Sequence, residues 1–342
     1  MTNWQIRSLY GRICQYPNGR GIVLLSSTTI KPEGSPAKRV KRSNKLTRSA
    51  TWFCFLGLLP ILALFTYIRL IPIVKTFYMS LFQWDMVSPK KPFIGLQNYI
   101  TLFQNENFLI SLKNTTIIAF NVFLFSVPFA LMLAVLILNQ VRFKSWYEAI
   151  YFLPFIAPMV PVTVIWKWIL DANNGLMNYF ISFFGISSKA WLLDPKLAIV
   201  SVIMLTVWKT LGYNMVIFMV GLKGISKEYY EAAAIDGATG IKAFWHITVP
   251  ILKPITVFVS VITLIHSYNV FSQIYILASD VQGAPGYVVR VLVYDMIENG
   301  FRFFKMGYAS AEAVILFLIV LALTLIQLGL AKERTSSKKG LS

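Results

Sequence analysis

The most regular feature of this sequence is a series of long apolar runs separated by polar segments. Each run is about as long as the 20 or so residues that a helix needs to cross a bilayer. The runs are continuous and do not alternate, so we predict helices, which satisfy their own backbone hydrogen bonds in lipid, rather than strands. The six predicted spans are Thr51 to about Val74, the run between Lys113 and Arg142, Ala149–Leu170, Leu197–Leu222, Pro254–Ser279 and Ala313–Ala331. The pattern therefore predicts an all-α polytopic membrane protein with six transmembrane helices.

The composition agrees with a membrane protein. Hydrophobic residues make up 56% of the chain and charged residues 13%, which is too little charge to cover a soluble globule of this size. The net charge of +18 is compatible with nucleic-acid binding or with basic cytoplasmic loops. If the N-terminus is cytoplasmic, the segments predicted on that side hold 20 basic residues and those on the other side hold 9. This asymmetry predicts both termini in the cytoplasm and explains the charge without nucleic acid.

Two basic segments flank the apolar runs. Residues 1–50 carry ten basic residues and one acid, Glu33, and no apolar core of a cleavable signal peptide. We expect a disordered cytoplasmic tail here. The alternatives are a segment that lies against anionic lipid headgroups and a translation start assigned upstream of the native start codon. Residues 332–342 are expected to form a second basic cytoplasmic tail, which leaves 51–331 as the membrane domain.

Residue types with catalytic or metal-binding chemistry form no recognisable motif. Cys14 and Cys54 make no CxxC pair, and His246 and His266 are twenty residues apart, which is not a metal-ligand spacing. The sequence contains no GxxxxGK[ST] loop, no HExxH and no nucleophile elbow. We therefore expect no enzymatic activity and no cofactor in this chain. Because the phosphate-binding loop is missing, a function that uses ATP would need another subunit to bind it.

The segment 226–250, between the fourth and fifth predicted spans, has the pattern of a helix, a turn and a second helix. Ser226 is a favourable N-cap, and Glu228 lies in the first turn, where the helix dipole favours an acid. Gly237 is free to adopt a positive φ at the turn, and Pro250 limits the second helix. These features predict a short, stiff hairpin in which alanines admit a close partner and acids offer acceptors. An ordinary interfacial loop is the alternative.

The hairpin carries Glu231-Ala232-Ala233, followed by Gly237, Ile247 and Pro250 at fixed spacing. This pattern resembles the EAA signature of the membrane subunits of binding-protein-dependent ABC importers: Glu-Ala-Ala, three residues, Gly, nine residues, Ile, one residue, Leu-Pro. Asp236, Ala238 and Phe244 also fit the sugar-importer version, and Val249 replaces the Leu of the signature.

The resemblance extends from about residue 50 to the end of the chain. Gly95–Tyr99 looks like the outer segment before the second span of these subunits, Phe152–Pro158 like the start of the third span, and Met306–Ala311 like the lead into the sixth. These matches are typical of the carbohydrate-uptake branch, which includes maltose, multiple-sugar and glycerol-3-phosphate systems. After the fifth span Gly283-Ala-Pro285 replaces the usual Gly-Gly-Pro, and Ser272 stands where an Asp is common, so the match is weaker there.

The resemblance implies a permease subunit that forms half of a translocation pathway for a sugar or sugar-like solute, with the hairpin seated in a cytoplasmic ATPase. The ATPase-coupling residues would be Glu228, Glu231, Ala232, Ala233, Asp236, Gly237, Ile247 and Pro250. The implied partners are a second, related permease subunit in a heterodimer, two cytoplasmic subunits that bind ATP and Mg, and an extracytoplasmic solute-binding protein. The implied location is the bacterial inner membrane, with no nucleic-acid partner.

Polar residues inside apolar spans are costly, so they are candidates for contact with a solute. A sugar site needs groups that match hydroxyls, together with aromatic faces. By resemblance to the maltose-importer subunit, the candidates are Tyr213, Asn214, Ser267, Asn269 and Gln273; contacts with neighbouring helices or water are the alternative for each. Lys209 and Arg69 are expected to snorkel to the headgroups. Pro154, Pro158 and Pro161 are expected to bend the third span.

Other functions remain possible interpretations of the same pattern. A secondary transporter or channel for a small polar solute is the first, although no inverted repeat is evident. A membrane-bound enzyme would need the catalytic motifs that are missing, and a membrane-tethered nucleic-acid binder would depend on the basic tail alone. The solute stays open among disaccharides, oligosaccharides, polyol glycosides and glycerol phosphate.

Overall fold

The computed structural model describes the backbone of residues 44–140, 142–278 and 289–336. The expectations for Cys14, for most of the basic N-terminal tail, for the segment around Gly283–Pro285 and for the last residues fall outside these ranges. The chain divides into two compact units, Met1–Pro60 and Ile61–Ser342. The described residues of the first unit belong to one helix, and the second unit holds the remaining elements.

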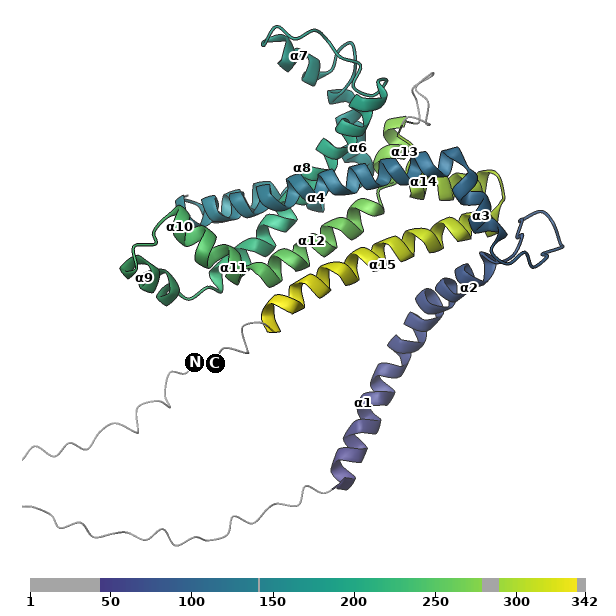
Figure 1. Ribbon diagram of the computed structural model, residues 1–342, viewed down its shortest axis with the longest axis horizontal. Helices are drawn as coiled ribbons and strands as arrows, with labels where there is room; N and C mark the ends of the chain where they lie inside the picture. Colours follow the sequence, from purple (N-terminus) through teal and green to yellow (C-terminus); the bar gives the residue numbers. More distant parts are fainter. Residues whose placement is uncertain (1–43, 141, 279–288, 337–342) are drawn as a thin grey trace, which may run out of the picture. The chain divides into compact units, whose positions relative to one another are not determined.

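Every regular element in the described ranges is a helix (Figure 1), and strand pairing there is limited to two isolated bridges. The first elements are α1 (Asn44–Phe65), the π-helical segment η1 (Thr66–Leu70), α2 (Ile71–Met79), α3 (Gln97–Gln104), α4 (Glu106–Gln140), α5 (Lys144–Ile156), α6 (Met159–Ile169) and α7 (Leu176–Ser182). They are followed by α8 (Pro195–Lys223), α9 (Lys227–Ile235), α10 (Ile241–Ala243), η2 (Phe244–Thr248), α11 (Val249–Ile251) and α12 (Lys253–Tyr268). The last elements are α13 (Ser272–Ala278), α14 (Leu292–Ile297), η3 (Glu298–Arg302) and α15 (Met306–Ser336).

The candidate membrane spans follow the order of the predicted apolar runs. Four continuous helical stretches are long and apolar enough to cross a bilayer: Phe55–Met79, Glu106–Leu138, Pro195–Lys223 and Met306–Gly329. Two bent pairs qualify only when their halves are taken together: α5 with α6, and Ile241–Ile251 with α12. The described chain is therefore a polytopic helical protein with four spans, or six if each bent pair crosses as one.

The third predicted span is broken, as its prolines led us to expect. α5 and α6 meet at an angle of 97°. Ala157 is extended, with φ −59° and ψ 136°, because the ring of Pro158 disfavours the helical conformation of the residue before it. Pro154 lies inside α5. The backbone at this break therefore leaves carbonyl groups without helical partners.

The fifth predicted span, Pro254–Ser279, is not a single helix. α12 ends at Tyr268, Asn269 leaves the helical conformation as its C-cap, and α13 begins only at Ser272. The Asn269 side chain donates to the Ile265 carbonyl at 2.7 Å, which satisfies one of the carbonyls freed at the helix end. The apolar run is continuous in the sequence, so its hydrophobicity did not reveal that the helix is interrupted.

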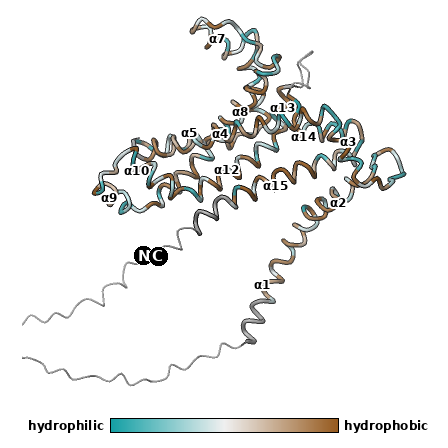
Figure 2. The backbone as a smooth tube through the Cα atoms, in the orientation of Figure 1, coloured by the Kyte–Doolittle hydropathy of each residue, from teal (hydrophilic) through white to brown (hydrophobic). Residues whose placement is uncertain are grey.

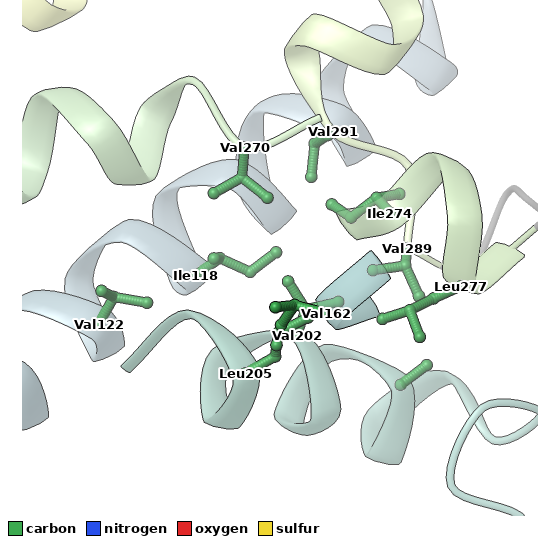
Figure 3. Packing of buried hydrophobic residues seen from close by; sticks show 11 residues of the cluster. Ile118, Val122, Val162, Val202, Leu205, Val270, Ile274, Leu277, Val289 and Val291 are labelled. Carbon is green, nitrogen blue, oxygen red and sulfur yellow. The ribbon is translucent and has the colours of Figure 1, made fainter. Parts of the chain in front are cut away.

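The core of the second unit forms where α4, α8 and α12 pack together, with α5 alongside α8. Small residues recur along the buried face of α4, at spacings of one or two helical turns: Ser111, Ala119, Ser126, Ala130 and Ala134. Small side chains let helices approach closely in lipid, where packing rather than water exclusion drives association. Beside this contact, side chains from α4, α6, α8, α13 and the segment before α14 form one apolar cluster (Figure 3).

Hydrophobic residues make up much of the helices (Figure 2), and many of their large apolar side chains are exposed. The most apolar stretch of Phe55–Met79 has no buried residue, and the exposed side chains of α1 and α2 include Phe53, Leu56, Ile61 and Val74. Helices that are apolar on their exposed sides are typical of proteins surrounded by lipid or by other membrane subunits.

Candidate functional site

The turn of the 226–250 segment is closed by backbone hydrogen bonds. The Ser226 hydroxyl accepts from the Glu228 N–H at 3.4 Å and caps α9. At the other end the Ala238 N–H donates to the Ala233 carbonyl at 2.8 Å and the Gly237 N–H to the Ala234 carbonyl at 3.1 Å. This pair of bonds is a Schellman motif, and it requires the positive φ of 75° at Gly237. The predicted role of Gly237 in the turn is thus borne out by its geometry.

The second arm of the hairpin is less regular than its pattern indicates. After Gly240, which also has a positive φ of 57°, the chain forms α10, the π-helical η2 and α11 in succession. The Tyr230 hydroxyl of α9 lies 2.9 Å from the Thr248 hydroxyl of η2, within hydrogen-bond distance. Ala233 and Ala243 are buried, one in each arm. The hairpin is therefore held together by side chains as well as by its turn.

The predicted coupling residues do not all face outward. Ala233 is turned into the hairpin, whereas Glu228, Glu231, Ala232, Asp236, Gly237 and Pro250 are exposed and Ile247 is partly buried. Large apolar side chains stand beside the exposed ones: Ile235 is 88% exposed, Ile241 78% and Trp245 61%. Sequence reasoning overlooked these three exposed apolar residues.

A cavity of about 210 Å³ lies farther along the helices that leave the hairpin. Its lining comes from α5, α6, α8, α12, α13 and the residues between α12 and α13: Phe155, Met159, Thr206, Lys209, Thr210, Tyr213, Asn214, Ile262, Thr263, His266, Asn269, Val270 and Gln273. The hairpin connects directly to two helices that line the cavity: α8 ends three residues before Ser226, and α12 begins two residues after the end of α11, at an angle of 68° to the segment Ile241–Ile251.

Four of the five predicted solute contacts line this cavity. The Tyr213 ring stacks on Phe155 with centroids 4.5 Å apart and planes 20° from parallel, and Asn269 and Gln273 lie on the lining as well. The fifth residue, Ser267, is buried, and its hydroxyl donates to the Thr263 carbonyl of its own helix at 2.7 Å. Ser267 is therefore satisfied inside α12 and is not part of the lining.

Asn214 reaches the cavity but also joins three helices. Its Nδ2 donates to Ser126 Oγ on α4 at 2.9 Å and to Thr263 Oγ1 on α12 at 3.0 Å. Both amide hydrogens are used in these bonds, and the side chain is buried. The sequence left two interpretations of Asn214 open: contact with a solute, or contact with neighbouring helices or water. For the amide nitrogen, the structure shows contact with neighbouring helices.

Lys209 does not snorkel to the headgroups as expected. Its Nζ donates to the carbonyls of Ala157 at 2.6 Å, Pro154 at 2.9 Å and Phe155 at 3.4 Å. The expectation was wrong because the break of the third span places free carbonyls beside α8. His266 is a second basic residue of the lining, and sequence reasoning did not select it as a candidate for solute contact. Its position one helical turn before the candidate Asn269 was the available indication in the sequence.

A cluster of charged side chains lies apart from this cavity, around α14 and η3. Arg290 pairs with Asp295 through Nε at 2.6 Å and with Glu298 through Nη2 at 2.5 Å, and Arg290 and Asp295 are both buried. Asn299 donates to Glu312 of α15 at 2.9 Å. Sequence reasoning missed this cluster, although acids close to apolar segments such as Asp295 and Glu312 were a usable signal. In the part of the chain that the structure describes, no His, Cys, Asp and Glu side chains group in a way that would hold a metal ion.

Comparison with known proteins gives a consistent result. The family described as "Binding-protein-dependent transport system inner membrane component" matches residues 119–335. The probable ABC transporter permease protein YurN of Bacillus subtilis is 34% identical, with 80% of this chain and 94% of YurN covered. The arabinooligosaccharides transport system permease protein AraP of the same organism is 31% identical over 89% of this chain and 96% of AraP.

A further relative and a solved structure extend the comparison. The sn-glycerol-3-phosphate transport system permease protein UgpA of Agrobacterium fabrum is 32% identical over 77% of this chain and 89% of UgpA. The fold also matches a chain of a bacterial ABC transporter that imports the acidic polysaccharide alginate, with a TM-score of 0.73, 24% identity, and coverage of 84% of this chain and 99% of that one. The family match covers more than half of the sequence and these relatives align over most of it, so the chain belongs to the inner-membrane components of binding-protein-dependent transport systems and is a permease subunit of an ABC importer.

Proposed function

We propose that this permease forms half of the pathway for a sugar or sugar-like solute and that the hairpin 226–250 couples the pathway to a separate ATPase. One observation carries the proposal: the two arms of the hairpin continue into α8 and α12, and both helices line the cavity. A displacement of the hairpin is therefore transmitted to the cavity walls through two rigid helices. Such rigid-body movement around a fixed site is the physical basis of alternating access.

The hairpin surface fits a protein partner. Its exposed tip combines Ile235, Ile241 and Trp245 with the carboxylates of Glu231 and Asp236. Apolar anchors surrounded by polar groups are typical of specific interfaces. In this proposal the partner is the cytoplasmic ATPase, which binds ATP and Mg, and the remaining partners are a second, related permease subunit and an extracytoplasmic solute-binding protein.

The proposed topology has six spans and both termini in the cytoplasm: α5 and α6 together form the third span, and the segment that contains α12 and α13 forms the fifth. The excess of basic residues on the cytoplasmic segments supports this orientation. Residues 1–50 and 332–342 are then cytoplasmic tails, and the hairpin emerges between the fourth and fifth spans. Arg290 and its acidic partners lie on the opposite side of the membrane.

The cavity favours a solute with hydroxyl groups and an apolar face. The stacked rings of Tyr213 and Phe155 provide a flat apolar surface, and Asn269 and Gln273 provide amides. The names of relatives support a sugar: they include an arabinooligosaccharide permease and the trehalose/maltose permease MalF of Thermococcus litoralis, which is 28% identical. The cavity volume of about 210 Å³ in the single subunit would be enlarged by the second subunit of the heterodimer.

Cross-linking tests the coupling assignment. Ile235→Cys, in a variant whose native cysteines are replaced by serine, should cross-link to the co-expressed ATPase subunit and react with thiol reagents from the cytoplasmic side. Val220→Cys, exposed on the membrane-spanning α8, is the matched control and should do neither. Reaction of Ile235→Cys from the outside of intact cells would overturn the orientation. Uptake that continues without the ATPase gene would favour a secondary transporter or channel.

A further inference from the structure

Lys209 joins two helices where the third apolar run breaks. α5 ends at Ile156, and its terminal carbonyls lack helical partners because Ala157 is extended ahead of Pro158. The ammonium group of Lys209, on α8, donates to three carbonyls at this break, those of Pro154, Phe155 and Ala157. A positive charge at a helix C-terminus is also favoured by the helix dipole.

The hydrogen-bonding capacity of Lys209 is fully used in this contact. An ammonium group has three donors and no acceptor, and three carbonyls receive them. Among the described residues Lys209 takes part in no ion pair with a carboxylate. Its Nζ therefore has no donor left for a solute, although the residue lies on the cavity lining.

The next turn of α8 continues the contact with α5. A Cβ atom at Gly212 would lie 1.8 Å from the Tyr151 carbonyl oxygen, so only glycine permits this approach. Tyr213 then stacks on Phe155, a residue whose own carbonyl is bound by Lys209. Lys209, Gly212 and Tyr213 together fix the end of α5 against α8, and the stacked rings form one wall of the cavity.

We propose that Lys209 is a positioning residue for the solute: by capping the broken end of α5 it sets the place of Phe155 and hence the aromatic wall of the cavity. This inference rests on the proposed function of the cavity as the solute site. Without the ammonium group, the carbonyls at the break lose their partners inside the membrane, where unpaired polar groups are costly. The end of α5 then moves to find other donors, and Phe155 moves with it.

Two variants and a control test the inference in the assembled transporter. Lys209→Met removes the donors and keeps most of the aliphatic length, and Lys209→Arg restores donors and charge. Lys196→Met is the matched control, because Lys196 lies on the same helix with an exposed side chain. Co-elution of all subunits in size-exclusion chromatography of the complex in lipid nanodiscs reports correct assembly in all three variants. Lys196→Met should also keep the wild-type basal ATPase activity.

The first readout is the position of α5. Spin labels at Ile156→Cys and Trp208→Cys, in a background without native cysteines, should give one narrow distance distribution with Lys209, a broadened or displaced one with Lys209→Met, and a narrow one again with Lys209→Arg. The second readout is equilibrium binding of radiolabelled arabinotriose, maltose or trehalose, whichever the wild-type complex takes up, measured without the solute-binding protein. We expect Lys209→Met to weaken binding by about tenfold and Lys209→Arg to stay within about twofold of the wild type.

The outcomes separate the two proposals. A Lys209→Met complex with wild-type distances and wild-type binding overturns the positioning role. Loss of assembly in Lys209→Arg as well as in Lys209→Met also overturns it, because the residue would then serve stability alone. If the distances change as expected but neither Lys209→Met nor Tyr213→Ala affects binding, the solute assignment of the cavity fails while the cap on α5 stands.

Discussion

The hydroxyl groups of Tyr230 and Thr248 lie 2.9 Å apart and join the two arms of the hairpin. Tyr230 belongs to α9, which follows the cavity-lining helix α8, and Thr248 belongs to η2, which leads through α11 into α12. This contact and the Schellman turn at Gly237 hold the two arms of the hairpin together. In the proposed coupling, a hairpin joined in this way transmits force from the ATPase to both helices at once.

Tyr230→Phe should loosen the hairpin without altering its fold. The substitution removes one partly buried hydrogen bond, worth about 1 kcal/mol, and leaves Thr248 without this partner. We expect slower solute-stimulated ATP hydrolysis at unchanged assembly, measured with the complete transporter in proteoliposomes. Tyr229→Phe is the control, because Tyr229 is 58% exposed on the same helix. Equal effects of the two substitutions would contradict the role of the contact.

Gly237→Val should uncouple ATP hydrolysis from uptake while the protein still inserts into the membrane. A β-branched residue at a φ of 75° is strained by about 1–2 kcal/mol, so the turn that orients the two arms should open. Gly57→Val introduces the same side chain at a glycine without positive φ and with open space around it. We expect the control to transport normally; normal uptake by Gly237→Val at normal expression would reject the coupling assignment.

Glu231→Lys reverses one charge on the exposed face of the hairpin. The proposed ATPase partner would meet a cation where it pairs with an acceptor, and like-charge contacts cost several kcal/mol at an interface. We expect the ATPase subunit to be lost from the purified complex, whereas Lys227→Glu, a charge reversal at the start of the same helix, should disturb it less. Retention of the ATPase by Glu231→Lys would show that this face is not the docking surface.

Tyr213→Ala and Asn269→Ala should each weaken solute binding, because one removes a stacking face and the other an amide of the cavity. A lost stacking partner or hydrogen bond of this kind costs about 1 kcal/mol, or roughly fivefold in affinity. Ser267→Ala provides the contrast, since its hydroxyl is satisfied within α12. Binding of radiolabelled sugar to the purified complex is the measurement, and wild-type affinity in both cavity variants would reject this site.

Arg290→Met should strongly reduce stability, because Asp295 is buried and would be left without this partner. Breaking one side of a buried ion pair typically costs about 3–5 kcal/mol. The double variant Arg290→Met/Asp295→Leu removes both charges and should recover part of the loss. Thermal unfolding of the detergent-solubilised complex distinguishes the cases; a double variant less stable than Arg290→Met would contradict this account of the cluster.

Local and periodic features of this chain were determined by the sequence itself. Apolar runs of spanning length predict membrane helices because their lengths match the bilayer, and the EAA spacing at Glu231–Pro250 identified the family because its motif lies within one short segment. The helix start at Ser226 and the turn at Gly237 were also predicted correctly, since capping and positive φ depend on the residues at those positions. The prolines of the third run predicted its bend for the same reason.

Contacts between distant segments were decided only by the tertiary structure. Lys209 caps carbonyls more than fifty residues earlier in the chain, and nothing in its own neighbourhood separates this role from snorkelling. Ser267 and Asn269 are two residues apart and both donate to carbonyls of α12. Only Asn269 lines the cavity, because the helices that pack around α12 decide which of its positions face the cavity. The buried pairing of Arg290 with Asp295 likewise follows from packing. Hydrophobicity places helices in a membrane, but polar groups inside it must find partners, and those partners come from the fold.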